Sequence, residues 1–94
     1  MPVILVIYDI RDDTVRNTVA KRLTALGFIR VQKSAYVRRG TSGVARHVFR
    51  SLSRLIDTST DKLLVIPVPE RVYATSYAAG SKVVGDGRHV TILT

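Results

Sequence analysis

The stretch Val3-Ile4-Leu5-Val6-Ile7-Tyr8-Asp9, near the start of a chain of 94 residues, decides the fold. Its β-branched apolar run predicts a central strand that is covered on at least one face. The run is too short to cross a bilayer and lacks a basic leader, so we expect neither a membrane span nor a signal peptide. Asp9 ends the strand, and Asp12 or Asp13 is expected to cap the helix that follows.

The remaining elements are placed outward from this strand. Apolar residues at helical spacing predict a first helix over residues 14–26, which Gly27 ends. A second helix is expected to begin after the cap Thr41-Ser42-Gly43 and to carry Phe49 on its apolar face. Strands are expected over residues 28–32, 35–38, 62–68, 71–79 and 89–93, with a flexible turn over residues 80–88.

The resulting order is β-α-β-β-α-β with an extra C-terminal strand, which is the order of an α+β, ferredoxin-like sandwich. We expect residues 1–94 to form a single domain. Residues 78–94 would form a flexible turn and a C-terminal strand that is exchanged with, or docked on, a partner. Two helices would cover one face of the antiparallel sheet. A second protomer is the simplest cover for the other face, so we expect a homodimer.

Positive charge is concentrated in the middle of the chain. The net charge is +8, and no Asp or Glu lies between residues 14 and 56. Such an unmixed block is typical of a surface that binds polyanions, and Arg forks match phosphate oxygens. The chain has no Cys, which excludes thiol catalysis and suits the cytoplasm. The block contains Arg16, Lys21, Arg22, Arg30, Lys33, Arg38, Arg39, Arg46, Arg50 and Arg54.

The second helix carries Arg46, Arg50 and Arg54 in a row opposite its apolar side. This row fits either a nucleic-acid contact or the solvated face of an ordinary amphipathic helix. The aromatic rings of Tyr8 and Tyr36 are likewise open to two interpretations, because strand aromatics can stack on bases or belong to the core.

Asp9 is the candidate for chemistry, because a carboxylate at the end of a rigid strand can point into a cleft. Mg²⁺ is often held by one or two carboxylates together with water and phosphate. Two Asp9 residues brought together across a dimer axis would therefore make a site. A divalent cation there would neutralise phosphate charge and help to form a hydroxide nucleophile. The alternative for Asp9 is a turn residue that bonds the nearby backbone.

Several short motifs, taken as a set, resemble a known family. The segment Val6-Ile7-Tyr8-Asp9-Ile10 is followed in register by Arg16-Asn17, by Gly27 and by Arg30-Val31-Gln32-Lys33-Ser34-Ala35-Tyr36. This set is similar to CRISPR-associated protein two, the small partner of the CRISPR integrase in the adaptation module. The similarity is dense from residue 3 to about residue 40.

The resemblance implies a homodimer that bridges two integrase dimers and helps to hold DNA during spacer acquisition. It also implies metal-dependent endoribonuclease or double-strand DNase activity, with Asp9 binding Mg²⁺ or another divalent cation. The family's other site positions fall on Tyr8, Arg16, Arg30 and Tyr36. We expect Arg38, Arg39, Arg46, Arg50 and Arg54 to add contacts to nucleic acid.

Two other functions remain open from the sequence. One is a non-catalytic, DNA-binding scaffold that bridges integrase dimers. The other is an unrelated basic ferredoxin-like protein that binds RNA, or a ribonuclease toxin. The sequence has no convincing aromatic motif of the RNA-recognition type, which disfavours the RNA-recognition version.

Overall fold

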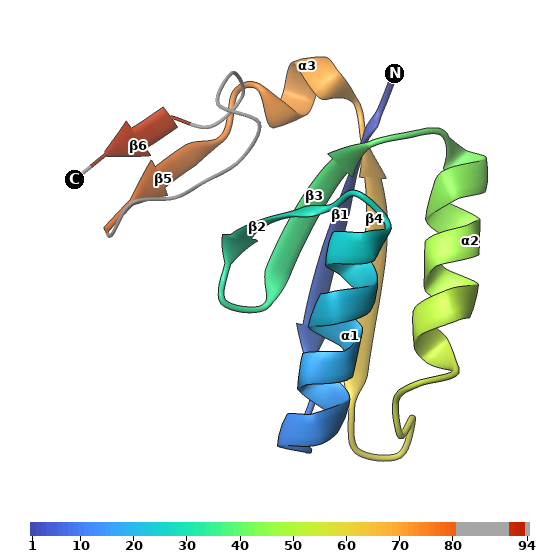
Figure 1. Ribbon diagram of the computed structural model, residues 1–94. Helices are drawn as coiled ribbons and strands as arrows, with labels where there is room; N and C mark the ends of the chain where they lie inside the picture. Colours follow the sequence, from blue (N-terminus) through green and yellow to red (C-terminus); the bar gives the residue numbers. More distant parts are fainter. Residues whose placement is uncertain (81–90, 94) are drawn as a thin grey trace.

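An antiparallel sheet of four strands and two long helices forms the body of the computed structural model (Figure 1), which describes residues 1–80 and 91–93. The strands lie in the order β2-β3-β1-β4, so the predicted ferredoxin-like α+β fold is confirmed. The elements are β1 Val3–Asp9, α1 Asp13–Ala25, β2 Ile29–Gln32, β3 Ala35–Arg39, α2 Ser42–Ser53, β4 Lys62–Val68, α3 Glu70–Tyr73, β5 Tyr77–Ala79 and β6 Thr91–Leu93.

Local signals in the sequence fix the ends of both long helices. Asp12 caps α1 by accepting a hydrogen bond from the backbone N–H of Val15 at 2.9 Å. Gly27 follows the end of α1 with a φ of 87°, a conformation that glycine adopts without strain. Thr41 caps α2 through its hydroxyl oxygen, which accepts from the N–H of Val44 at 3.3 Å. Both ends of α1 lie within one residue of the prediction, and α2 begins at Ser42, inside the predicted cap Thr41-Ser42-Gly43.

The core lies between the sheet and the two long helices, which share one side of the sheet (Figure 1). Alternation along β1 turns Ile4, Val6 and Tyr8 toward the helices, where all three are buried. Leu23 of α1 and Leu52 of α2 are fully buried opposite them. This face of the sheet therefore holds the main hydrophobic contacts of the fold.

Phe49 differs from the prediction, because its side chain is 47% exposed rather than packed in the core. Successive helical residues are about 100° apart, so Phe49 lies at the margin of the apolar stripe formed by Val48 and Leu52. The helix α2 packs on β4, which is the last strand of the sheet, so the sheet offers Phe49 no further strand to pack on.

The other face of the four-stranded sheet, called the open face here, is apolar but is not covered by α1 or α2. It is formed by side chains that alternate with the core residues. Ile7 and Leu64 pair across β1 and β4 on this face, and they are 40% and 53% exposed. Two apolar residues of the open face, Val3 and Val37, are buried. The apolar residues of the open face are Val3, Leu5, Ile7, Ile29, Ala35, Val37, Leu64, Ile66 and Val68.

The chain beyond β4 departs from the prediction. Residues 71–79 were expected to form one strand, but a helical turn, α3, precedes the short strand β5. The turn forms because the N–H groups of Val72 and Tyr73 both donate to the carbonyl of Pro69, at 2.9 and 3.0 Å. The strand β5 pairs in parallel with β6, which falls inside the predicted strand over residues 89–93. The predicted turn over residues 80–88 lies outside the described residues except for Gly80.

No helix in the described part of the chain has the length and apolar character needed to cross a membrane.

Candidate functional site

Asp9 lies at the last position of β1 and is exposed. Alternation places its side chain on the same side of the sheet as Ile7, so Asp9 borders one end of the open face. Its partner across β1 and β4 is Lys62, which is also exposed. Within the part of the chain that the structure describes, the Asp9 carboxylate accepts no hydrogen bond and forms no ion pair. The turn-residue alternative, which needs such a bond to the backbone, is therefore not supported.

A divalent cation at Asp9 would need further ligands. Among residues 1–80 and 91–93, no three His, Asp or Glu side chains come close enough to hold a metal ion. Asp9 nevertheless offers the hard, exposed oxygen that Mg²⁺ prefers, and Mg²⁺ often completes its shell with water and phosphate. The donor set therefore fits a site shared with a second copy or with a nucleic-acid phosphate, and Asp9 would be the residue that holds the ion.

Tyr8 and Tyr36 form a buried pair on the side of the sheet that faces the helices. Their rings stack with centroids 6.1 Å apart and an angle of 22° between the planes. The pKa of Tyr8 is raised to about 12, mainly by burial and also by the neighbouring hydroxyl of Tyr36, while Arg30 and Arg16 act in the opposite direction. Tyr8 is therefore protonated at neutral pH. Since both residues are buried, neither ring offers a surface on which a nucleic-acid base could stack.

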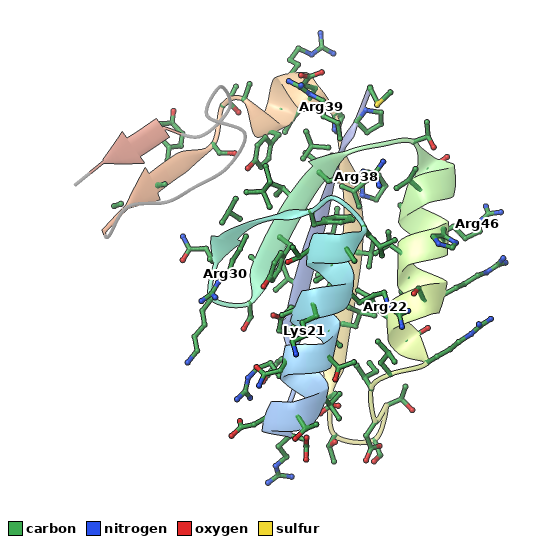
Figure 2. The ribbon with its side chains drawn as sticks, in the orientation of Figure 1. Lys21, Arg22, Arg30, Arg38, Arg39 and Arg46 are labelled. Atoms are coloured by element: carbon green, nitrogen blue, oxygen red, sulfur yellow. The ribbon has the colours of Figure 1, made fainter. Side chains whose placement is uncertain are left out.

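Arg16 holds the loop between β1 and α1. Its Nη1 donates to the carbonyl of Ile10 at 2.9 Å, and its Nη2 forms an ion pair with Asp13. Arg30 projects from the outer strand β2 in Figure 2, away from α2. Both cations act on the pKa of Tyr8, whereas the side chain of Asp9 belongs to the opposite face of the sheet. One copy of the chain therefore gathers Tyr8, Tyr36, Arg16 and Arg30 but separates them from Asp9.

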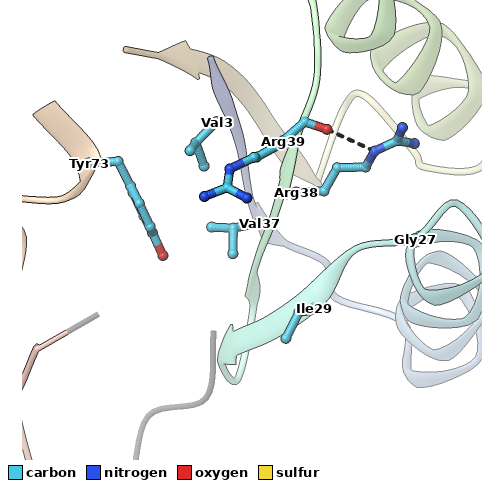
Figure 3. Close-up of a pocket in the computed structure, with 7 residues that line it drawn as sticks. All are labelled: Val3, Gly27, Ile29, Val37, Arg38, Arg39 and Tyr73. Atoms are coloured by element: carbon cyan, nitrogen blue, oxygen red, sulfur yellow. Dashed lines mark hydrogen bonds between the residues drawn. The ribbon is translucent and has the colours of Figure 1, made fainter. Parts of the chain in front are cut away.

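Arg38 and Arg39 point to opposite faces of β3 (Figure 3). Arg38 donates to the carbonyl of Leu26 at 2.7 Å, which satisfies a backbone group at the end of α1. Arg39 forms an ion pair of 2.6 Å with Glu70 of α3. Beside it lies a hollow of about 230 Å³ at the end of the open face farther from Asp9. Both arginines thus have structural partners, and their contact with nucleic acid remains a prediction.

The row of three arginines predicted on the second helix begins in α2, which contains Arg46 and Arg50, and ends at Arg54, the C-cap of α2. Arg46, Arg50 and Arg54 are exposed, and Figure 2 shows Arg46 projecting from the outer surface of α2. Because α2 covers the helix side of the sheet, this row lies across the sheet from Asp9. The structure therefore contains two separate cationic regions, one near Tyr8 and one along α2.

Two residues of the site region were missed in the sequence. Lys62 stands opposite Asp9 only through the register of β1 with β4, and strand register over so long a separation cannot be read from the sequence. Glu70 binds Arg39 through the turn α3, which was predicted as a strand. Pro69 followed by Glu70 is a helix-start signal that could have revealed it.

Taken together, these features define a small basic ferredoxin-like domain with one exposed carboxylate at the end of its central strand. A family model described as "CRISPR associated protein Cas2" matches residues 1–75. The CRISPR-associated endoribonuclease Cas2 of Aeropyrum pernix is 36% identical over 99% of this chain and 100% of its own length. The chain therefore belongs to the Cas2 family.

Two further matches show a family relative and the fold. A CRISPR-associated endonuclease Cas1/endonuclease Cas2 fusion of Thermoproteus tenax is 33% identical over 78% of this chain and 28% of the fusion. The crystal structure of a hypothetical protein from Thermus thermophilus matches with a TM-score of 0.64 and 32% identity, covering 71% of this chain and 80% of that one.

Proposed function

We propose that the chain is a metal-dependent endoribonuclease of CRISPR adaptation that works in the cytoplasm as a homodimer. The observation that carries the proposal is the exposed carboxylate of Asp9, which borders an apolar sheet face in a chain whose relatives are named endoribonuclease Cas2. The substrate would be RNA or duplex DNA, since both offer the phosphodiester that the cationic groups recognise.

The open face supports the homodimer. Large apolar side chains on an exposed sheet are typical of an interaction site rather than of a monomer surface. Ile7, Ile29 and Leu64 are 39–53% exposed on this face. Two copies that pack through it would cover these side chains and bring the two Asp9 carboxylates to one interface.

Each group of the proposed site has a distinct task. Asp9 of each copy holds the divalent cation, which supplies charge neutralisation at the phosphate and a nucleophilic hydroxide when it is bound. Lys62, opposite Asp9, lies where it can hold a phosphate oxygen against the carboxylate. Arg16 and Arg30 contact other phosphates of the substrate, because the sheet separates them from Asp9 of the same copy. Protonated Tyr8, on the same side as these arginines, acts as a hydrogen-bond donor rather than as a base.

The experiment compares Asp9→Asn with the unmodified chain in RNA cleavage with Mg²⁺ and with EDTA. We expect the substitution to lower cleavage by roughly 10²-fold or more, as removal of a charge-stabilising group usually does. RNA affinity should change little. Asp57→Asn is the matched control, because Asp57 is exposed on the loop before β4 and its amide replacement still accepts from Ser59. Full cleavage by Asp9→Asn would remove Asp9 from the mechanism.

The second candidate is a non-catalytic scaffold that holds DNA between integrase dimers. Two observations favour it. The arginine row that begins in α2 lies on the side of the sheet away from Asp9. The relative from Thermoproteus tenax is named as a fusion of Cas1 and Cas2. Tyr77 of β5, 88% exposed, would then belong to the surface that docks the integrase. Spacer acquisition that survives Asp9→Asn would favour the scaffold, and loss of acquisition with intact assembly would favour the nuclease.

A further inference from the structure

Asp61 is the only charged side chain that is buried among residues 1–80, with 9% of its surface exposed. It lies directly before β4, at the end of a turn in which its N–H donates to the carbonyl of Asp57 at 2.7 Å. Burying a carboxylate is costly unless its oxygens accept hydrogen bonds, so the partners of Asp61 indicate what it does. The proposed catalysis gives this residue no task.

Both carboxylate oxygens of Asp61 have partners, and they belong to two different loops. Oδ2 accepts from the N–H of Asp57 at 3.0 Å, which closes the turn that contains Asp61. Oδ1 accepts from the N–H of Arg11 at 3.0 Å, across 50 residues of sequence. The bond from Arg11 is the largest cause of the lowered pKa of Asp61. A residue that served only its own turn would not need this second bond, so Asp61 connects its turn to the loop after β1.

The bond to Arg11 fixes a peptide group that lies one residue beyond Asp9. This group consists of the carbonyl of Ile10 and the N–H of Arg11. Arg16 donates from Nη1 to the carbonyl at 2.9 Å, and Asp61 accepts from the N–H at 3.0 Å. Because a peptide group is planar, bonds on both of its sides fix its orientation. The chain is therefore held in one direction as it leaves Asp9.

A second connection runs from Asp61 to Asp9 through β4. The N–H of Tyr8 donates to the carbonyl of Ser34, just before β3. The backbone groups of successive strand residues point to opposite neighbours, so those of Asp9 face its partner Lys62 in β4. Lys62 directly follows Asp61 in the chain. The turn that Asp61 closes therefore determines where β4 begins opposite Asp9.

Asp9 depends on such support from its backbone. It is the last residue of β1, and the ends of elements open more readily than their centres. Within the part of the chain that the structure describes, no hydrogen bond or ion pair orients its carboxylate. A group that holds a metal ion must stay within about 0.5 Å of its productive position. The backbone on both sides of Asp9 must therefore supply that precision.

We propose that Asp61 is a positioning residue for Asp9, which it holds through the peptide group after Asp9 and through the start of β4. The inference rests on the proposed function for its effect on cleavage, whereas its effect on the backbone can be measured without any activity. The alternative is that Asp61 stabilises only its own turn.

The first test compares Asp61→Ala with Asp57→Ala in amide hydrogen exchange followed by NMR. Each variant removes one carboxylate from the same turn and raises the net charge of +8 by one. Asp57 accepts through Oδ1 from the N–H and the hydroxyl of Ser59, at 3.0 and 2.6 Å, so its loss does not free Arg11. We expect the N–H groups of Arg11 and Asp9 to exchange at least ~10-fold faster in Asp61→Ala. Both rates should stay unchanged in Asp57→Ala.

The second test measures RNA cleavage with Mg²⁺ at a temperature well below the melting point of each variant. We expect kcat to fall roughly 10-fold in Asp61→Ala while KM changes by less than about 2-fold, because a displaced catalytic group weakens transition-state binding more than substrate binding. Asp57→Ala should keep both values. Asp61→Asn retains one acceptor oxygen and should give intermediate values in both tests. If Asp61→Ala does not fold, Asp61→Asn takes its place in each comparison.

Several results would overturn the proposal. These are equal exchange rates or equal kcat values for the Asp61 and Asp57 variants, faster exchange at Arg11 with no change at Asp9, or a loss of activity through KM alone. If Asp9→Asn abolishes cleavage while Asp61→Ala keeps its kcat, the positioning proposal fails alone. If Asp9→Asn cleaves RNA normally, the nuclease proposal fails, and the exchange rate at Asp9 alone decides whether Asp61 positions it.

Discussion

The two faces of the four-stranded sheet are built from the same strands but have opposite surroundings. Along β1, Ile4 and Val6 are fully buried beneath the helices, whereas Ile7 on the open face is 40% exposed. Both faces are apolar, so hydrophobicity alone does not separate a folding core from an association surface. The covered face holds the chain together, and the open face carries Asp9 at its edge. The two faces should therefore respond differently to the same kind of substitution.

The largest effect is expected from Leu52→Ala on the covered face. Leu52 has no exposed surface, so its truncation leaves a cavity and should lower the free energy of unfolding by about 2–5 kcal/mol. Leu64→Ala, 53% exposed on the open face, should cost only about 0.5 kcal/mol in the isolated chain. Urea unfolding at low protein concentration measures both. Equal losses would show that the two faces contribute alike to the fold.

A charge on the open face tests the homodimer directly. Leu64→Lys should weaken self-association by roughly 10²-fold, because an unpaired charge would be buried at the interface. Light scattering across a concentration series measures the change. Phe49→Lys is the control, since Phe49 has a similar exposure of 47% but lies on the helix side. A monomeric unmodified chain at micromolar concentration, or equal dissociation of both variants, would contradict an interface on the open face.

The sequence predicted the covered face much better than the open one. The helices, β1 and β4 carry strong local signals, namely apolar periodicity, the caps Asp12 and Thr41, and Gly27. The open face depends on strand register, which pairs Leu64 with Ile7 and Lys62 with Asp9. Register arises from tertiary packing and turn geometry, so no local pattern shows it. For the same reason Asp9 was identified as a candidate, but its neighbour Lys62 was not.

A smaller change in stability is expected from substitutions of glycine. Gly27 lies in the turn that connects α1, which packs on the covered face, to β2. Gly27 has a φ of 87°, and a Cβ there would meet Arg38 only at 3.9 Å, so backbone strain and not a clash sets the cost. Gly27→Ala should destabilise the fold by about 1–2 kcal/mol. Gly43→Ala, inside α2 and free of such strain, should stabilise it by about 0.5–1 kcal/mol. Thermal unfolding that moves both variants in the same direction would contradict this account.

The smallest effect is expected in the loop that returns α2 to β4 on the covered side. Asp61 accepts from the N–H groups of Arg11 and Asp57, both at 3.0 Å, and these bonds hold its pKa below the ordinary value of 3.8. Hydrogen bonds from Ser59 likewise lower the pKa of Asp57. Because the folded state favours the charged carboxylates, their contribution to stability is present above about pH 4 and is lost as the pH falls through the lowered values.

Asp61→Asn removes one of these titrations. The variant should melt at a lower temperature than the unmodified chain at neutral pH, and the difference should narrow as the pH falls below about 4. The effect is expected to be small because the loop lies at the margin of the core and Asp57 beside it is exposed. Melting temperatures of both chains, measured from neutral pH to below about pH 4, test this prediction. If the two curves of melting temperature against pH are parallel, Asp61 stabilises the loop through packing and not through its charge. The loss of stability at low pH would then come from other titrating groups.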